Sequence, residues 1–325
     1  MKLLVNYLRE LYRESIDGWN RFWFSPTHVE TLCAIRVLAG LMLVYTHLVW
    51  TIDLGGFFGD QGRLSVEFSN QYQRLTEQGS YAWSHLFWLT EAQMNVVHYA
   101  ALVVLVLFTV GLWTRVTSVL SFLITVSYAH RAAGALFGLD QINGLLSMYL
   151  MIGPSGACYS IDRWLQKRRN PNAVVSESVS ANLAIRLIQI HLCIIYFFAA
   201  IGKMLGASWW DGNALWLAFG NYEYQTLDMT WLAAYPLVIH ALSQFTVLWE
   251  LTYSFLVWPR LSRPIIVGLS VPLHLGIAIC MGMITFGTVM LFANMSFVSP
   301  QLVRGIVDRV RGRAGEPKVT ASSAV

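Results

Sequence analysis

The sequence predicts an all-α fold: a polytopic helical membrane protein with about eight transmembrane helices. Of its 325 residues, 56% are hydrophobic and only 12% are charged, whereas soluble domains carry about 25% charged residues. The stretches 96–113 and 265–284 contain no Asp, Glu, Lys or Arg, and each approaches the roughly 20 residues that a helix needs to span a bilayer. This composition excludes a soluble enzyme, a disordered chain and a nucleic-acid-binding module.

The expected spans follow one another from residue 30 onward. The fourth is the least regular, because Gly153, Pro154 and Gly156 interrupt its end. The sixth is longer than a bilayer requires, so it must tilt, kink at Pro236 or protrude. The last two are short and closely joined, and alternatively form a re-entrant pair. In chain order the spans are 30–52, 94–112, 116–137, 140–158, 182–202, 231–258, 264–282 and 284–299.

The distribution of lysine and arginine predicts the orientation of these spans. Most of the 22 basic residues lie in the N-terminal segment, in alternate loops and after the last span. The other loops carry only Arg63, Arg74 and Lys203, together with most of the loop acids. Because positively charged loops stay in the cytoplasm, we expect both termini there, in a membrane such as the bacterial inner membrane.

The spans divide the chain into three parts. These are a cytoplasmic N-terminal segment (1–29), a transmembrane domain (30–300) whose partner is the lipid bilayer, and a basic cytoplasmic tail (301–325). After Arg304 we expect the tail to be disordered at an anionic membrane surface. Two outer loops, about 53–93 and 203–230, are long and rich in aromatic residues. They are candidates for lids or interfacial helices over an outward-facing cavity.

Apart from Glu30 and Asp140 at span ends, four charged residues lie within the expected spans. A charge at the helix centre costs about 2.5–3.5 kcal/mol. Arg36 and Glu250 lie at matching depths, about two turns from the inner ends of spans one and six. We therefore expect a salt bridge between them. Arg186 lies near the inner end of span five and can extend its head group to the surface. Arg131 lies near the outer end of span three.

The fifth span carries the clearest polar pattern. Gln189, Tyr196 and Lys203 are spaced by seven residues and therefore share one face of a helix. Such a stripe either lines a cavity or faces neighbouring helices. For Lys203, contact with a ligand and anchoring at the membrane interface both remain open.

A layer of polar residues is expected at one depth near the outer side. Its members are His130, Arg131, Asp140, Lys203, Asp211 and His240. The layer predicts an outward-opening cavity between spans three, five, six and seven, with Lys203 facing it. No metal site is expected, because the cysteines lie singly and no HxxxH pair occurs within a span.

Several segments resemble a known family. IQIHLCIIYFFAAIGKMLGASWWDGNALW (188–216) and VPLHLGIAICMGMITFGTVMLFANMSFVSPQLVR (271–304) resemble two segments of vitamin K-dependent gamma-glutamyl carboxylases. The opening WNRFWFSPTHVETLCAIRVLAGLML (19–43) and YSIDRWL (159–165) resemble two more. These similarities cover most of residues 19–305. The chain is identified as similar to the HTTM (horizontally transferred transmembrane) family, which includes the carboxylases.

The resemblance implies a set of site residues. In the carboxylases a lysine of the first segment is the base that deprotonates vitamin K hydroquinone, and Lys203 falls at that position. The histidine of the later segment corresponds to His274. We expect Lys203 to be catalytic and a quinone cofactor, vitamin K hydroquinone or another, to bind near the remaining candidates. These are His130, Asp140, Tyr196, His240 and His274.

The sequence also departs from the carboxylase pattern. Gly138, Leu139 and Asp140 stand where carboxylases have an Asn-Asn-His cluster. We also expect no counterpart of the large lumenal domain that binds the protein substrate. Three functions therefore remain open. The protein is a quinone-dependent, carboxylase-like lyase with an outward-facing site; or a non-catalytic protein that assists maturation, export or immunity of a secreted peptide; or a quinone-binding subunit of a redox complex. Nucleic acid is not an expected partner.

Overall fold

The computed structural model describes residues 2–76, 82–223 and 225–312, and over these residues it is helical, with no β-strand. The longer helices are α1 (Lys2–Phe24), α2 (Glu30–Thr51), α5 (Glu91–Val110), α6 (Thr114–Arg131), α7 (Gly138–Ile152), α9 (Val179–Met204), α12 (Pro236–Leu256), α13 (Arg263–Cys280) and α14 (Ile284–Asn294). The shorter ones are α3 (Leu54–Phe58), α4 (Val66–Leu75), α8 (Ile161–Arg169), α10 (Ala207–Trp210), α11 (Ala214–Phe219) and α15 (Pro300–Val310). Single 3₁₀ turns are η1 (His85–Trp88), η2 (Ala133–Ala135), η3 (Thr230–Ala234) and η4 (Met295–Phe297).

Each of the eight predicted spans coincides with one helix, but not every such helix is long and apolar enough to cross a bilayer. Among the described residues, α2, α5, α9 and α13 meet both conditions. A fifth span results if α14 with η4 and α15, which are bent by 119°, count as one broken span. The helices α7 and α14 contain only 15 and 11 residues, and α6 carries a row of serines and threonines. The count of eight therefore stays a prediction.

Local signals in the sequence set the helix boundaries. Thr90 and Gln93 form a capping box at the start of α5, and the Ser178 side chain accepts a hydrogen bond from the Ala181 amide at the start of α9. Gly111 ends α5 in the left-handed conformation, with φ 73°. A side chain at Gly111 would also collide with the Arg36 guanidinium, so this turn needs glycine for two reasons.

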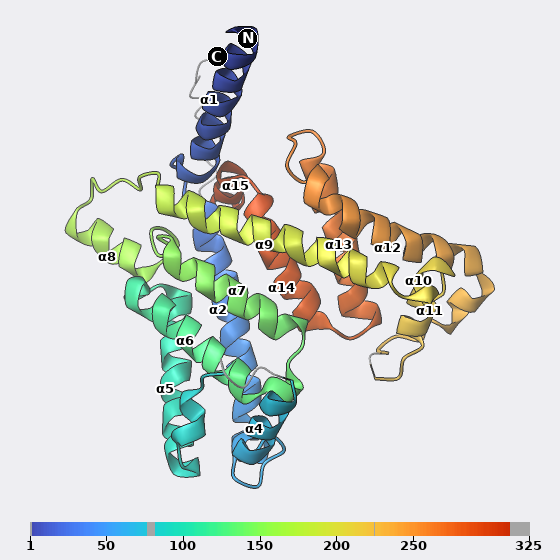
Figure 1. Cartoon of the computed structure of the whole chain (residues 1–325). Coiled ribbons are helices and arrows are strands. Elements are labelled where there is room, and N and C mark those ends of the chain that lie inside the picture. The colour runs from blue at the N-terminus through green and yellow to red at the C-terminus, as the bar shows by residue number, and fades with distance from the viewer. Residues whose placement is uncertain (1, 77–81, 224, 313–325) are drawn as a thin grey trace.

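Two groups of helices spread from one end of the molecule. An antiparallel bridge between Thr27 and Ser178 joins the segments that precede α2 and α9. From there α2 and α9 diverge, as Figure 1 shows. Helix α5 packs on α2 and α6, and α6 packs on α7, which contacts both α2 and α9. Helix α12 packs mainly against α9, and α13 against α14. The two long loops that were predicted to lie outside follow different helices: α3, α4 and η1 follow α2, and α10 and α11 follow α9 (Figure 1).

The predicted salt bridge between Arg36 and Glu250 is wrong. Arg36 is completely buried and donates from Nη2 to the carbonyl of Tyr159 at 2.5 Å. Glu250 instead pairs with Lys203. The prediction matched depth in the membrane, but α2 and α12 belong to different groups of helices, so equal depth did not bring their side chains together.

The predicted tail begins with a helix. Ser299 caps α15 by accepting from the Leu302 amide, Pro300 occupies the first turn, and the helix continues to Val310. Disorder from Arg304 onward is therefore wrong for residues 304–310. The reason is packing: α15 lies against α2 and buries Val303. Residues 313–325 of the predicted tail lie outside the described residues.

Candidate functional site

A cavity of about 600 Å³ lies beside the C-terminal end of α9. Its wall is built by α11, η3, α12, α13 and the turn between α13 and α14. Small-molecule sites typically have volumes of about 300–1,000 Å³ and mostly apolar walls. Among the described residues that line this cavity, only Lys203 and Glu250 are charged. The cavity therefore has the size and chemistry of a site for an apolar ligand with one polar end.

Helical spacing on α12 and α13 explains why the wall is apolar. Val238, Leu242, Thr246 and Glu250 follow one another at intervals of four residues and share the face of α12 toward the cavity. On α13 a similar face contributes Leu269, Leu273, Ile277 and Cys280. The second outer loop completes the enclosure with Trp209, Phe219 and Met229. Residues of this loop thus line a cavity, as predicted, whereas the first loop contributes none of the described lining. The outward orientation of the cavity stays a prediction.

The two charged residues of the wall form an ion pair. Lys203 Nζ donates to Glu250 Oε1 at 2.9 Å and lies 2.7 Å from Oε2. The Glu250 side chain is 9% exposed and the Lys203 side chain 25% exposed. Lys203 lies in the last turn of α9, and a helical side chain leans toward the N-terminus of its own helix. It therefore reaches back along α9 to Glu250, and Nζ lies 5.4 Å from the centre of the Trp209 ring.

Beside this pair, four buried side chains form a hydrogen-bonded network that joins four helices. Tyr196 Oη of α9 lies 2.6 Å from His274 Nε2 of α13. The Asn294 amide of α14 donates to Tyr196 Oη at 2.8 Å, and Tyr253 of α12 donates to Asn294 Oδ1 at 2.7 Å. All four residues are buried. Since Tyr196 precedes Lys203 by two turns on the same face, the network lies deeper in the bundle than the ion pair.

The structure brings together some of the predicted site residues and separates others. Lys203 lines the cavity, and Tyr196 and His274 contact each other. His130, Asp140 and His240 are absent from the described cavity wall. His240 is exposed on α12 and lies against Gly212, a residue with φ 72°.

The cavity is therefore bounded by predicted spans five, six and seven but not by span three, which is a correction. The expected polar layer was predicted on the assumption that residues at the same depth in the membrane lie close to one another. Helix α6 packs on α5 and α7, and α7 contacts α9 near His191, about three turns before Lys203. Equal depth therefore does not bring His130 of α6 or Asp140 of α7 to the cavity wall.

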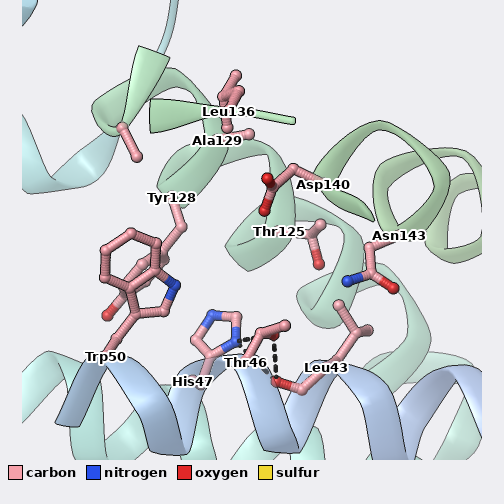
Figure 2. Close-up of a pocket in the computed structure, with 11 residues that line it drawn as sticks. Leu43, Thr46, His47, Trp50, Thr125, Tyr128, Ala129, Leu136, Asp140 and Asn143 are labelled. Carbon is pink, nitrogen blue, oxygen red and sulfur yellow. Dashed lines mark hydrogen bonds between the residues drawn. The ribbon is translucent and has the colours of Figure 1, made fainter. Parts of the chain in front are cut away.

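His130 and Asp140 have other contacts. The Asp140 carboxylate accepts from the Phe137 amide at 3.1 Å and so caps the first turn of α7. Figure 2 shows that it points, with Thr125 and His47, into a pocket of about 20 Å³. His130 Nδ1 lies within hydrogen-bonding distance of the Trp83 backbone. This pocket has room for about one water molecule and none for a cofactor.

The sequence interpretation missed three residues in the half of the molecule formed by α9 and α12 to α14. Glu250 was assigned to Arg36, and Asn294 and Tyr253 were not considered. Asn294 could have been found, because it is the only amide in an otherwise apolar helix, and such a side chain needs a partner in the membrane. Tyr253 follows Glu250 by three residues and therefore lies on the same side of α12.

The apolar helices and the cavity define an integral membrane protein with a site of ligand size. In the described part of the chain, no three His, Cys, Asp or Glu side chains form a group that could hold a metal ion. A family model described as the HTTM domain matches residues 24–301, so the chain belongs to the HTTM family. Comparison with curated proteins finds no match, and neither does comparison with solved structures.

Proposed function

We propose that the cavity beside α9 binds a quinone, either vitamin K hydroquinone or a related compound, and that Lys203 and Glu250 contact its ring oxygens. The observation that carries this proposal is the single ion pair on an otherwise apolar wall. A quinone has the complementary chemistry, because an apolar ring and tail carry oxygen atoms at the ring edge. The volume of about 600 Å³ accepts the ring and part of the tail.

The residues of the wall fit such a ligand. The Lys203 ammonium has three donors for a ring oxygen, and the Glu250 carboxylate can accept from a ring hydroxyl. Trp209 and Phe245 supply aromatic surface. Tyr196, His274 and Asn294 fix α9, α13 and α14 relative to one another. When bound, the cofactor supplies the redox chemistry, and the protein supplies a dry site and a charged contact.

For a carboxylase-like lyase, the ion pair changes the role expected for Lys203. An ammonium group has no lone pair and cannot accept a proton. Glu250 Oε1 or Oε2 is therefore the acceptor for a proton from a ligand hydroxyl, and Lys203 stabilises the negative charge that remains. We propose this division of roles for the enzymatic reaction. The expected partnership with a secreted peptide stays a prediction.

A second candidate function is quinone binding without carboxylation, as in a subunit of a redox complex. It is favoured by the positions of His130 and Asp140, which lie outside the described cavity wall. Asp140, which stands at the position of the carboxylase Asn-Asn-His cluster, and the nearby His130 therefore do not contact Lys203 or Glu250. Both candidates share quinone binding and differ in whether carbon dioxide is transferred.

Titration of the purified full-length protein with menadione tests the shared proposal. Trp209 and Trp231 line the cavity, so a bound quinone should quench tryptophan fluorescence to saturation. Lys203→Met should weaken binding about tenfold, which corresponds to 1.4 kcal/mol. Lys167→Met on α8 is the control and should leave binding unchanged. Equal binding by wild type and Lys203→Met would contradict the proposal. Incorporation of labelled bicarbonate into a glutamate-containing peptide then separates the two candidates.

A further inference from the structure

A second groove of about 600 Å³ runs between α2 and α15, away from the ion pair. Its sides are apolar: Ala34, Val37 and Leu38 come from α2, and Val303, Ile306 and Val307 from α15. Met295 and Val298 line it where the chain turns from α14 into α15. Two residues with polar groups, Tyr159 and Arg311, complete the described lining. The groove therefore combines an apolar trough with a cationic end.

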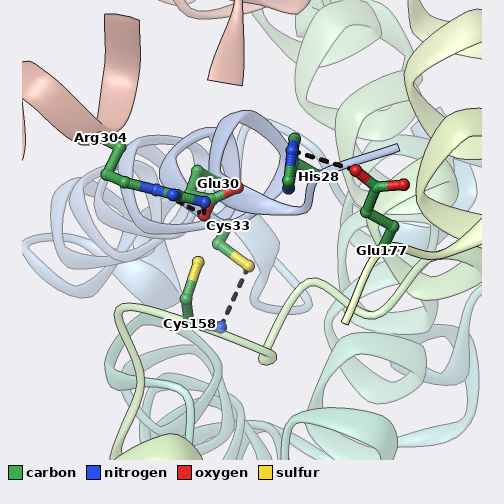
Figure 3. A network of polar contacts seen from close by, with 6 residues as sticks. All are labelled: His28, Glu30, Cys33, Cys158, Glu177 and Arg304. Atoms are coloured by element: carbon green, nitrogen blue, oxygen red, sulfur yellow. Dashed lines mark hydrogen bonds and ion pairs between the residues drawn. The ribbon is translucent and has the colours of Figure 1, made fainter. Parts of the chain in front are cut away.

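An ion pair holds α15 along α2 and so maintains the groove. Arg304 Nε donates to Glu30 Oε1 at 2.9 Å, and Nη2 contacts the same oxygen. Figure 3 shows this contact, which links α15 to the first turn of α2. Glu30 is 6% exposed, so its charge is satisfied by Arg304 rather than by water. The two walls of the groove are thus fixed relative to each other.

The polar end of the groove has an unused donor. Tyr159 has φ 52°, a conformation that is uncommon for residues other than glycine, and its carbonyl accepts from the buried Arg36. Its hydroxyl is buried but has no hydrogen-bond partner among the described residues. The Arg311 guanidinium carbon lies 5.4 Å from the centre of the Tyr159 ring. The guanidinium of Arg311 therefore lies beside the ring that carries this hydroxyl.

We propose that this groove binds an anionic phospholipid, with one acyl chain between α2 and α15 and the phosphate at Arg311 and Tyr159. A guanidinium is the side chain best suited to a phosphate. Arg304 is neutralised by Glu30, and over residues 305–311 Arg309 and Arg311 still outnumber the single acid, Asp308. This excess of positive charge favours an anionic over a zwitterionic head group. The apolar trough selects a lipid rather than free phosphate, because burial of each methylene contributes about 0.8 kcal/mol.

The test is a thermal melt of the purified full-length protein in neutral detergent, titrated with phosphatidylglycerol or phosphatidylcholine. A ligand that binds only the folded state raises the Tm with concentration. Phosphatidylglycerol should raise the Tm of wild type at concentrations at least about tenfold lower than phosphatidylcholine. Arg311→Gln should remove this difference. Arg309→Gln is the matched control, because Arg309 lies on the same helix but is not part of the described groove lining, and it should retain the difference.

Two further variants separate the parts of the proposed site. Tyr159→Phe removes only the hydroxyl and should weaken the phosphatidylglycerol effect severalfold. Ala34→Phe fills the trough and should weaken the effects of both lipids while the charge of α15 is unchanged. Equal responses to the two lipids in wild type, or equal responses of Arg311→Gln and Arg309→Gln, would overturn the proposal. An equal shift with inorganic phosphate alone would also overturn it, since the acyl chain would then have no role.

Discussion

A histidine contacts a tyrosine in each half of the molecule. Between α5 and α6, His98 Nδ1 lies 2.7 Å from Tyr128 Oη, and between α13 and α9, His274 Nε2 lies 2.6 Å from Tyr196 Oη. All four side chains are buried. Tyr128 borders a pocket of about 20 Å³, however, whereas Lys203, on the same helix face as Tyr196, borders a cavity of about 600 Å³. The same contact thus stabilises a closed part of the bundle in one half and supports a ligand-sized site in the other.

The two halves also differ in how they satisfy a cation. Arg131 donates to the carbonyls of Leu64, Ser65 and Phe58 and to the Ser69 hydroxyl. It therefore holds the first outer loop, including α3 and α4, against α6. Lys203 is instead paired with a carboxylate and borders the cavity. The planar guanidinium of Arg131 has several N–H donors and can bind several carbonyls at once. The ammonium of Lys203 is on a flexible stem and can contact both Glu250 and a ligand.

Arg131→Met should have the largest effect on stability. It leaves at least three buried acceptors without their donor, each costing about 1–3 kcal/mol, so we expect the free energy of unfolding to fall by about 4 kcal/mol. Thermal melts of the detergent-purified protein measure this change. Arg63→Met in the same loop is the control, since Arg63 is exposed. Equal melting temperatures for the two variants would show that Arg131 does not organise the loop.

Glu250→Gln should destabilise the protein by about 2 kcal/mol. The expected cost of breaking a fully buried pair is about 3–5 kcal/mol, but the Lys203 side chain is 25% exposed and partly solvated. In the double variant Lys203→Met/Glu250→Leu most of the loss should be recovered, because neither charge remains. A double-mutant cycle from Lys203→Met, Glu250→Leu and the double variant, followed in thermal melts, measures the coupling. If the effects of the two single substitutions on stability were strictly additive, Lys203 and Glu250 would not be paired. The difference between Lys203 and Arg131 described above would then not hold.

Tyr196→Phe tests whether the deeper network supports the cavity. It leaves His274 Nε2 and the Asn294 amide without their shared partner, at a cost of about 1–2 kcal/mol. We also expect weaker menadione quenching, because α9 and α13 lose a link beside the site. Tyr128→Phe is the matched variant in the other half and should lower stability without changing quenching. Equal quenching by both variants would remove the functional difference between the two histidine–tyrosine pairs.

Asp140→Asn should have the smallest effect. If Asp140 acts as the cap of α7, as the geometry indicates, the loss is about 0.5 kcal/mol. Menadione binding should not change, because Asp140 does not belong to the described cavity wall. A tenfold loss of binding would show that the two halves share one site.

The sequence was sufficient to predict the positions of the helices and the residues on one face of α9. Apolar runs marked the helix positions, and the spacing of Gln189, Tyr196 and Lys203 placed these residues on the face that meets other helices or the cavity. These features depend on local periodicity, which is a property of one helix at a time.

The arrangement between helices could not be predicted in the same way. Depth in the membrane fixes the position of a residue along the membrane normal only. It does not say which neighbouring helix the residue contacts. This explains why Arg36 was assigned to Glu250, and why His130 and Asp140 were assigned to the site of Lys203. The helical start of the tail was missed because its stability comes from packing on α2.

The short distance within the ion pair has an electrical consequence. A membrane potential does work on a charge in proportion to the fraction of the bilayer that the charge crosses, about 2.3 kcal/mol per 100 mV for the full thickness. A proton exchanged between Lys203 and Glu250 moves less than the 2.9 Å that separates Nζ from Oε1, about a tenth of the hydrocarbon core. The potential therefore changes the energy of this exchange by only about 0.2 kcal/mol per 100 mV. Proton movement within this pair is almost independent of whether the membrane is energised.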